Sequence, residues 1–142
     1  MRKVLVPIDG SENALRALKY AIAQRDVCRE PPHLVLVNVQ APIVSGAVKM
    51  FLAREQLDDF YGEEGEAALA PARDVAAASG LAMDHHILVG DPAETIAKVA
   101  REQACDLIVM GTRGLGTVTG VLLGSVATKV IHLSDRPVLL VK

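Results

Sequence analysis

The residues with the clearest chemical potential lie in a glycine-rich stretch between an apolar run and a helix-like run. Its five glycines are Gly111, Gly114, Gly116, Gly120 and Gly124. Glycine loses backbone entropy on folding, but a chain without Cβ atoms can approach an anion closely and direct N–H groups at it. The helix expected to begin at Ser125 adds free N–H groups and a favourable dipole. The stretch therefore predicts a phosphate-binding loop, with Ser125 as the N-cap of the helix.

Three phosphate-loop patterns can be compared with this stretch. A Walker A loop is excluded, because no Lys-Ser or Lys-Thr pair follows the last glycine. A dinucleotide fingerprint fits poorly, because it belongs to the first strand–helix turn and needs an acid ending the next strand, whereas Asp135 precedes one. The third pattern is Gly111, two residues, Gly114, nine residues, then Gly124-Ser125, and the sequence matches it throughout. A flexible surface loop without a ligand is the alternative interpretation.

Charged side chains could extend this candidate site. Arg113 lies within the loop and is the nearest cation for a terminal phosphate, while Lys129, one turn into the helix, is a weaker candidate. A solvated surface charge is the alternative interpretation for both. Asp9 ends the first apolar run, so it can reach the loop only if the two apolar runs form neighbouring strands.

Other reactive side chains show no catalytic or metal-binding pattern. His85 and His86 are adjacent on an expected strand and therefore point to opposite faces. Cys28 and Cys105 lack CxxC spacing, and we interpret them as structural thiols of a reducing compartment. His33 and His132 are separated in the expected fold, so no triad is predicted. We expect no catalytic residue and no protein metal site.

The elements that position the loop follow from five strand-like runs that alternate with helix-like runs. Strands are expected at residues 4–8, 33–39, 81–89, 106–110 and 137–141. Helices are expected at about residues 12–28, 51–79, 92–103 and 125–133, with a kink or interruption at Pro71. Residues 41–50 have no clear period and are interpreted as a surface excursion.

This alternation predicts the α/β class: a single doubly wound, Rossmann-like domain over residues 1–142. The five-stranded, mostly parallel sheet has helices on both faces, and order 3-2-1-4-5 would bring Asp9 beside the glycine loop. The composition agrees, because 51% of residues are hydrophobic and only 3% aromatic, which is typical of an aliphatic parallel-sheet core. The net charge of −2 and the absence of a long apolar span argue against nucleic-acid or membrane partners, and we expect a cytoplasmic protein.

The glycine spacing resembles that of the ATP-binding branch of the universal stress protein family. The likeness extends along the chain. The segments that resemble strands of the family are residues 4–11, 36–39, 108–114 and 137–141. The resemblance implies the adenine nucleotide α-hydrolase-like form of the α/β fold. Asn38 is one departure, because many family members carry histidine there; it changes a side chain beside the site and leaves the backbone edge intact.

The resemblance also implies a role for each site residue. Asp9 would face the ribose or a metal-bound phosphate, and the Val39 backbone would contact adenine between Pro7 and Met110. The loop glycines would wrap the phosphates, followed by the Ser125 hydroxyl and the N–H of the next residue. The expected nucleotide-binding residues are Pro7, Asp9, Val39, Met110, Gly111, Arg113, Gly114, Gly124, Ser125 and Val126.

The resemblance implies a stress-response module that binds ATP together with Mg²⁺ and is not an enzyme. The loop offers mainly neutral N–H donors and no evident base, so we expect at most slow ATP hydrolysis. By resemblance it would be a homodimer that pairs through the strand at residues 137–141, an apolar edge strand that needs protection. The alternatives are an ATP-using enzyme of the adenine nucleotide α-hydrolase group, whose His-x-x-His or Ser-Gly-Gly motif is absent, and a nucleotide-free dimeric scaffold.

Overall fold

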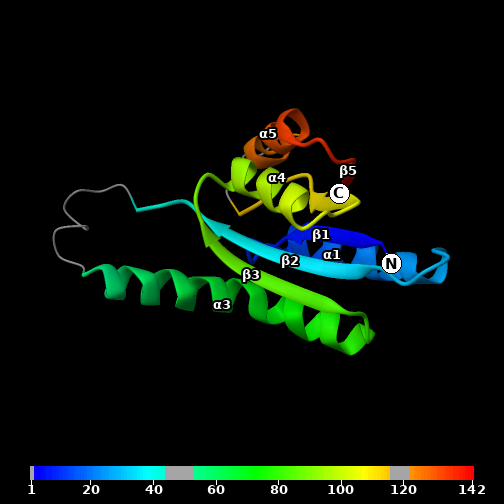
Figure 1. Ribbon diagram of the computed structural model, residues 1–142, viewed down its shortest axis with the longest axis horizontal. Helices are drawn as coiled ribbons and strands as arrows, with labels where there is room; N and C mark the ends of the chain where they lie inside the picture. Colours follow the sequence, from blue (N-terminus) through cyan, green and yellow to red (C-terminus); the bar gives the residue numbers. More distant parts are fainter. Residues whose placement is uncertain (1, 44–52, 116–121) are drawn as a thin grey trace.

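Five strands form one parallel sheet in the computed structural model, which describes residues 2–43, 53–115 and 122–142. The strands are β1 (Lys3–Pro7), β2 (His33–Gln40), β3 (Met83–Val89), β4 (Leu107–Gly111) and β5 (Val138–Val141). Their order is β3-β2-β1-β4-β5, which confirms the predicted order (Figure 1). The first and fourth strands are therefore neighbours, and their carboxyl ends lie at the same edge.

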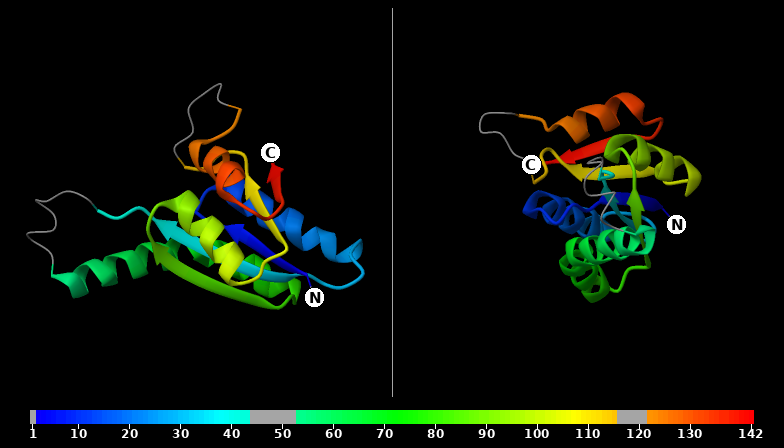
Figure 2. Two further views of the ribbon diagram at one scale, coloured as in Figure 1. Left: turned by 45° about the horizontal axis from the view of Figure 1, so that its top comes forward. Right: turned by 90° about the vertical axis from the view of Figure 1, so that its left-hand side faces the viewer.

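Helices cover both faces of the sheet, as the doubly wound class requires (Figure 2). They are α1 (Glu12–Ala23) with a short 3₁₀ turn η1 (Gln24–Asp26), α3 (Arg54–Ser79), α4 (Pro92–Glu102) and α5 (Ser125–Leu133). The helices α1 and α3 pack on one face, and α4 and α5 pack on the other. Among the described residues, no helix combines the length and the apolar character needed to cross a membrane.

The alternation of side chains along each strand divides the interior into two aliphatic cores. On β1, Val4 and Val6 enter the core under α1 and α3, whereas Leu5 enters the core under α4 and α5. On β2, residues 34–37 are all buried, because both faces of this strand are covered. Buried aliphatic runs of this kind are what a parallel sheet requires.

Three expectations about the helices need correction or limitation. The helix α1 ends at Ala23, earlier than expected, and continues only as the turn η1. The helix α3 runs through Pro71 without interruption, because Leu69, Ala72 and Ala76 on either side of the proline are buried against the sheet. Its expected start at residues 51–52 and most of the expected excursion, residues 44–50, lie outside the described residues.

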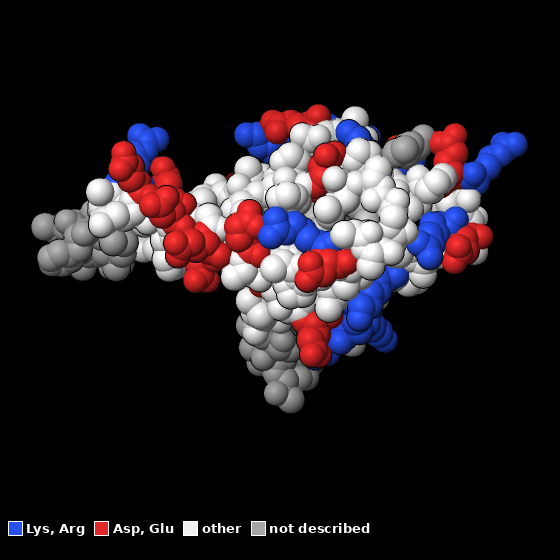
Figure 3. All heavy atoms as spheres, turned by 90° about the horizontal axis from the view of Figure 1, so that it is seen from below, with Lys and Arg blue, Asp and Glu red and all other residues white. Residues whose placement is uncertain are grey.

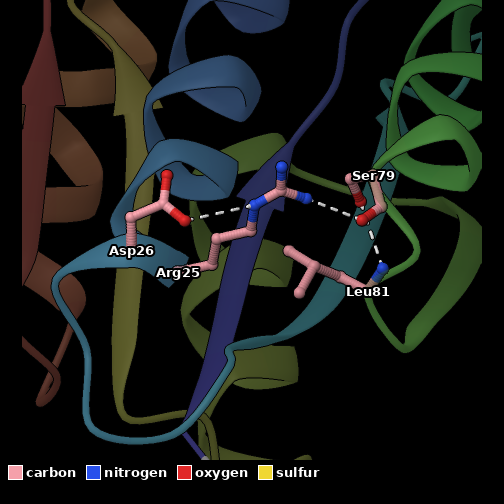
Figure 4. A network of polar contacts seen from close by, with 4 residues as sticks. All are labelled: Arg25, Asp26, Ser79 and Leu81. Carbon is pink, nitrogen blue, oxygen red and sulfur yellow. Dashed lines mark hydrogen bonds and ion pairs between the residues drawn. The ribbon is translucent and has the colours of Figure 1, made fainter.

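The end of α3 is tied to the turn after α1 (Figure 4). The Arg25 guanidinium donates to the Ser79 carbonyl at 2.7 Å and lies 3.7 Å from the Asp26 carboxylate. The Ser79 hydroxyl accepts the Leu81 N–H at 3.2 Å, and Gly80 takes the left-handed conformation (φ 73°) that ends the helix. These contacts fix the C-terminal half of α3 beside α1.

The other half of α3 projects beyond the sheet (Figure 1), and acidic side chains gather on this projecting part (Figure 3). Its exposed acidic residues are Glu55, Asp58, Asp59, Glu63 and Glu64. These five acidic side chains are therefore solvated.

Two glycines in α3, one turn apart, differ in their surroundings. Gly65 is buried against β3, and a Cβ there would lie 2.4 Å from Ile87 Cγ2. A Cβ on Gly62 would meet nothing within 4 Å. The helix therefore approaches the sheet closely at Gly65 and has free space at Gly62.

Alanine at these two positions should change stability in opposite directions. We expect Gly65→Ala to lower the free energy of unfolding by about 1–3 kcal/mol, because Ile87 or the helix must move. Gly62→Ala should raise it by about 0.5–1 kcal/mol, because glycine is the poorer helix former. Urea unfolding monitored by circular dichroism measures both, and an equal effect of the two substitutions would contradict this account of the packing.

Candidate functional site

A cavity of about 540 Å³ lies at the carboxyl ends of the central strands. Its walls come from the ends of β1, β2 and β4 and from the first turns of α1, α4 and α5. This is the topological switch point, where chain connections leave β1 and β4 toward opposite sides of the sheet. All ten residues predicted for the site lie in its lining: Pro7, Asp9, Val39, Met110, Gly111, Arg113, Gly114, Gly124, Ser125 and Val126.

One part of the cavity is apolar and bordered by backbone. Side chains of Pro7, Val39 and Met110 line it together with Ile96 of α4. The Val37 carbonyl accepts the Ile8 N–H at 2.8 Å, so the backbone of Val37 faces β1. Peptide groups alternate in direction along a strand, so the Val39 backbone faces the same way, past the end of β1. This arrangement suits a flat heteroaromatic group that needs an apolar surface and a polar edge.

The other part of the cavity is formed by the glycine loop and the start of α5. The Gly124 N–H donates to the Thr112 carbonyl at 2.6 Å, which joins the two limbs of the loop; we call this contact the loop neck. Directly after the neck, Ser125 and Val126 occupy the first turn of α5. The free N–H groups and the dipole of this turn favour an anion in the cavity.

Ser125 is not the N-cap of α5, contrary to the sequence-based expectation. The cap is Gly124, in extended conformation (φ −70°, ψ 162°), and Ser125 is the first helical residue. The Gly124 carbonyl accepts both the backbone N–H and the hydroxyl of Thr128. The Ser125 hydroxyl therefore does not cap the helix.

Each glycine of the matched spacing lies close to other atoms of the protein. A Cβ on Gly111 would lie 3.0 Å from Asn13 Cβ, and one on Gly124 would lie 3.3 Å from the Thr112 carbonyl oxygen. A Cβ on Gly114 would lie 2.5 Å from Asp9 Oδ2. The sequence interpretation assigned these glycines to phosphate contact alone. It missed these packing contacts, because the neighbours are distant in sequence or lie across the loop neck.

The Asp9 carboxylate joins β1 to the glycine loop. Its Oδ1 accepts the Ser11 N–H at 2.9 Å, and its Oδ2 accepts the Leu115 N–H at 3.2 Å. The sequence interpretation placed Asp9 against ribose or a metal-bound phosphate. In the structure its two oxygens also hold the backbone of its own turn, at Ser11, and that of Leu115, which is 106 residues away from Asp9.

The two candidate cations differ in their surroundings. Arg113 lines the cavity, whereas Lys129 points to α4, with its ammonium nitrogen 3.3 Å from Asp91 Oδ1. In the described part of the chain, no three His, Cys, Asp or Glu side chains are grouped to hold a metal ion. Arg113 is thus the cation that the structure places at the site.

Asp91 connects the starts of α4 and α5. Its carboxylate caps α4 by accepting the Glu94 N–H at 3.0 Å, and it pairs with Lys129. The hydrogen bond from Glu94, helped by Lys129, lowers the pKa of Asp91 below its ordinary value of 3.8. An acid with a lowered pKa in the folded state stabilises the fold at higher pH, and this contribution is lost as the pH falls through the lowered pKa.

Asp91→Ala should therefore lower the melting temperature at neutral pH, and the difference from the wild type should shrink as the pH falls below about 4. Asp91→Asn keeps a capping oxygen without the charge, so its melting temperature at neutral pH should lie between those of the wild type and Asp91→Ala. Differential scanning calorimetry across this range tests the assignment. A difference between wild type and Asp91→Ala that is the same at neutral and acid pH would contradict it.

Sequence reasoning missed the contribution of α4 and the hydrogen bonds of Asn38. Pro92 and Ile96 of α4 line the cavity, and the only available signal was the expected βαβ topology, which returns α4 to this edge. Asn38 is buried, and its amide donates to the Ile8 carbonyl at 2.9 Å while its oxygen accepts from Gln40. Asn38 thus holds the backbone of Ile8, directly after β1.

The remaining reactive residues lie away from this cavity. Cys105 is buried, and burial raises the pKa of its thiol, as suits a structural thiol. Cys28 is a free, partly exposed thiol. His85 is exposed and His86 partly buried on the edge strand β3.

The fold and the cavity together define a doubly wound α/β protein with a glycine-rich loop at its switch point. Comparison with known proteins identifies the family within this class. The profile of the universal stress protein family matches residues 1–142. The chain belongs to the universal stress protein family, and the predicted membership is confirmed.

Individual relatives agree with this assignment. Universal stress protein MJ0531 of Methanocaldococcus jannaschii is 35% identical over 99% of this chain and 82% of its own length. The solved structure of MJ0577 from the same organism superposes with a TM-score of 0.86 at 32% identity, over 99% of this chain and 95% of that one. A universal stress protein solved in complex with cAMP has a TM-score of 0.72 at 28% identity, over 99% and 97% of the two chains.

Proposed function

We propose that this protein binds ATP, together with Mg²⁺, in the cavity at the carboxyl ends of β1 and β4, and acts as a nucleotide-dependent regulatory module. The observation that carries the proposal is the convergence of an apolar pocket, a glycine loop and the start of α5 on one cavity. The cAMP complex of a related protein supports an adenine nucleotide as the ligand class.

In this proposal, different cavity residues contact different parts of the nucleotide. The Val39 backbone contacts the adenine edge, and Pro7 and Met110 contact its faces. The first-turn N–H groups of α5 and the Ser125 hydroxyl bind phosphate, and Arg113 supplies positive charge for the terminal phosphate. When bound, Mg²⁺ neutralises part of the phosphate charge and is held mainly by phosphate oxygens and water.

The same residues favour binding over hydrolysis. Within the described part of the chain, the charged residues that line the cavity are Asp9 and Arg113. Asp9 holds two backbone N–H groups, so it is poorly placed to activate a water molecule. We therefore propose a binding protein with at most slow ATP turnover.

We further propose a cytoplasmic homodimer that pairs through β5. This strand lies at the edge of the sheet and pairs with β4 in the described structure, and its four residues are half-buried. A second copy that pairs with the side of β5 facing away from β4 would protect this apolar strand from unspecific pairing.

Two measurements on the whole chain test the nucleotide proposal. First, purified protein is denatured and the supernatant is separated by anion-exchange chromatography, where co-purified ATP is expected. Second, calorimetric titration of nucleotide-free protein compares ATP–Mg²⁺, AMP and cAMP, with tightest binding expected for ATP–Mg²⁺. Absence of any adenine nucleotide together with no binding of all three ligands would overturn the proposal. Tighter binding of cAMP would overturn the assignment of ATP.

A further inference from the structure

We infer that Asp9 is a positioning residue that holds the start of the glycine loop, at Leu115, in place before any ligand arrives, and that position 114 must be glycine because of Asp9. The part of this inference that concerns ligand affinity rests on the proposed function. The part that concerns the loop does not, because it is a property of the ligand-free protein.

The contacts of Asp9 carry the first step of this inference. The side chain leaves the end of β1 and accepts one N–H from the start of α1, at Ser11, and one from the glycine loop, at Leu115. A carboxylate has two oxygens that can each accept such a bond, and bonds to a charged acceptor are stronger than neutral ones. The carboxylate thus bridges the first strand–helix turn and the glycine loop.

The charge of Asp9 supports the same conclusion. A carboxylate repels a phosphate, so a free carboxylate at the wall of an anion site would weaken binding. A carboxylate that holds two N–H groups instead has its charge shared with these donors. Its contribution to binding is then indirect: it fixes the loop that carries the phosphate donors.

Gly114 provides the second step, because its Cα lies directly against this carboxylate. A Cβ would be 2.5 Å from Asp9 Oδ2, well inside the van der Waals contact distance. Any larger residue must push away either Asp9 or the loop, and both movements break the bond to Leu115. The described ends of the loop are therefore held at two places, by Asp9 at Leu115 and by the loop neck at Gly124.

Amide hydrogen exchange of ligand-free protein, resolved by NMR, tests the positioning role directly. We expect the Leu115 amide to exchange at least about tenfold more slowly than in an unstructured peptide. In Asp9→Asn, one acceptor oxygen is replaced by an NH₂ group, and protection at Leu115 or Ser11 should be lost. Glu12→Gln removes one negative charge from the exposed first turn of α1 and should leave the Leu115 amide unchanged. The inference would be overturned if the Leu115 amide were unprotected in the wild type. It would also be overturned if the Leu115 and Ser11 amides were both as well protected in Asp9→Asn as in the wild type.

A double-mutant cycle with Gly114→Ala and Asp9→Ala tests why the glycine is needed. Each single variant should deprotect Leu115 and weaken ATP–Mg²⁺ binding, and the double variant should be no worse than Asp9→Ala alone. If the double variant instead lowered the affinity by the product of the two single effects, Gly114 would contribute to phosphate binding independently of Asp9. That result would overturn this part of the inference. If ATP does not bind the wild type, the proposed function fails, while the exchange data alone still decide the role of Asp9.

Discussion

Gly114→Val is expected to abolish measurable ATP binding while the protein remains folded. The first side-chain carbon would lie 2.5 Å from Asp9 Oδ2, and the two valine methyl groups increase the crowding. The atom in the way is the end of a side chain at a partly exposed position, so the loop and Asp9 can move without disturbing either core. The loss should therefore appear in affinity, by more than about 100-fold or 2.7 kcal/mol, and hardly in stability.

Calorimetric titration with ATP–Mg²⁺ measures the affinity, and circular dichroism with size-exclusion chromatography checks the fold and the assembly. Gly62→Ala is a suitable control, because it also replaces a glycine but has free space and lies outside the cavity lining. It should bind as the wild type does. Binding that survives in Gly114→Val would mean that the phosphates do not depend on this part of the loop.

Leu36→Ala is expected to cause the largest loss of stability, about 2–5 kcal/mol in the free energy of unfolding. Leu36 lies on β2, between β1 and β3, and is completely buried in the core under α1 and α3. Both neighbouring strands and both helices limit how far the surroundings can collapse into the space left by the three missing side-chain carbons. A loss of this size is a large part of the stability of a typical domain.

Urea unfolding gives this value, with Leu133→Ala as the matched control. Leu133 ends α5 and is 45% exposed, so the same substitution should change stability by less than about 1 kcal/mol. Similar losses for the two variants would show that Leu36 does not lie in a tightly packed core.

Much of the fold could be predicted because short-range signals coincide with the tertiary structure. The buried runs of β1, β2 and β4, the cap at Asp91 and the left-handed Gly80 all follow from local residue preferences. The capping of α5 could not be predicted in this way. Serine is usually the preferred cap, but the extended backbone of Gly124 and the bonds of its carbonyl to Thr128 place the start of the helix one residue earlier.

The ten residues expected at the site line one cavity, but the contacts that these residues make with one another were not predicted. These ten residues come together because the strand order places the ends of β1 and β4 side by side. The reasons for the glycines could not be obtained from the sequence, since Gly111 contacts Asn13 and Gly114 contacts Asp9 across about a hundred residues. Likewise, α3 continues through Pro71 because of burial that no local pattern reveals.

The loop neck has a consequence for how this protein can vary. The Gly124–Thr112 hydrogen bond and the Asp9–Leu115 contact fix the chain on both sides of the cavity, so whatever chain connects Leu115 to Leu123 leaves from a fixed base. The entropy of closing a loop grows slowly, by about 0.6 kcal/mol for each doubling of its length. Length changes between Leu115 and Leu123 should therefore cost little in loop-closure entropy, so the stability of the fold should depend only weakly on the length of this connection.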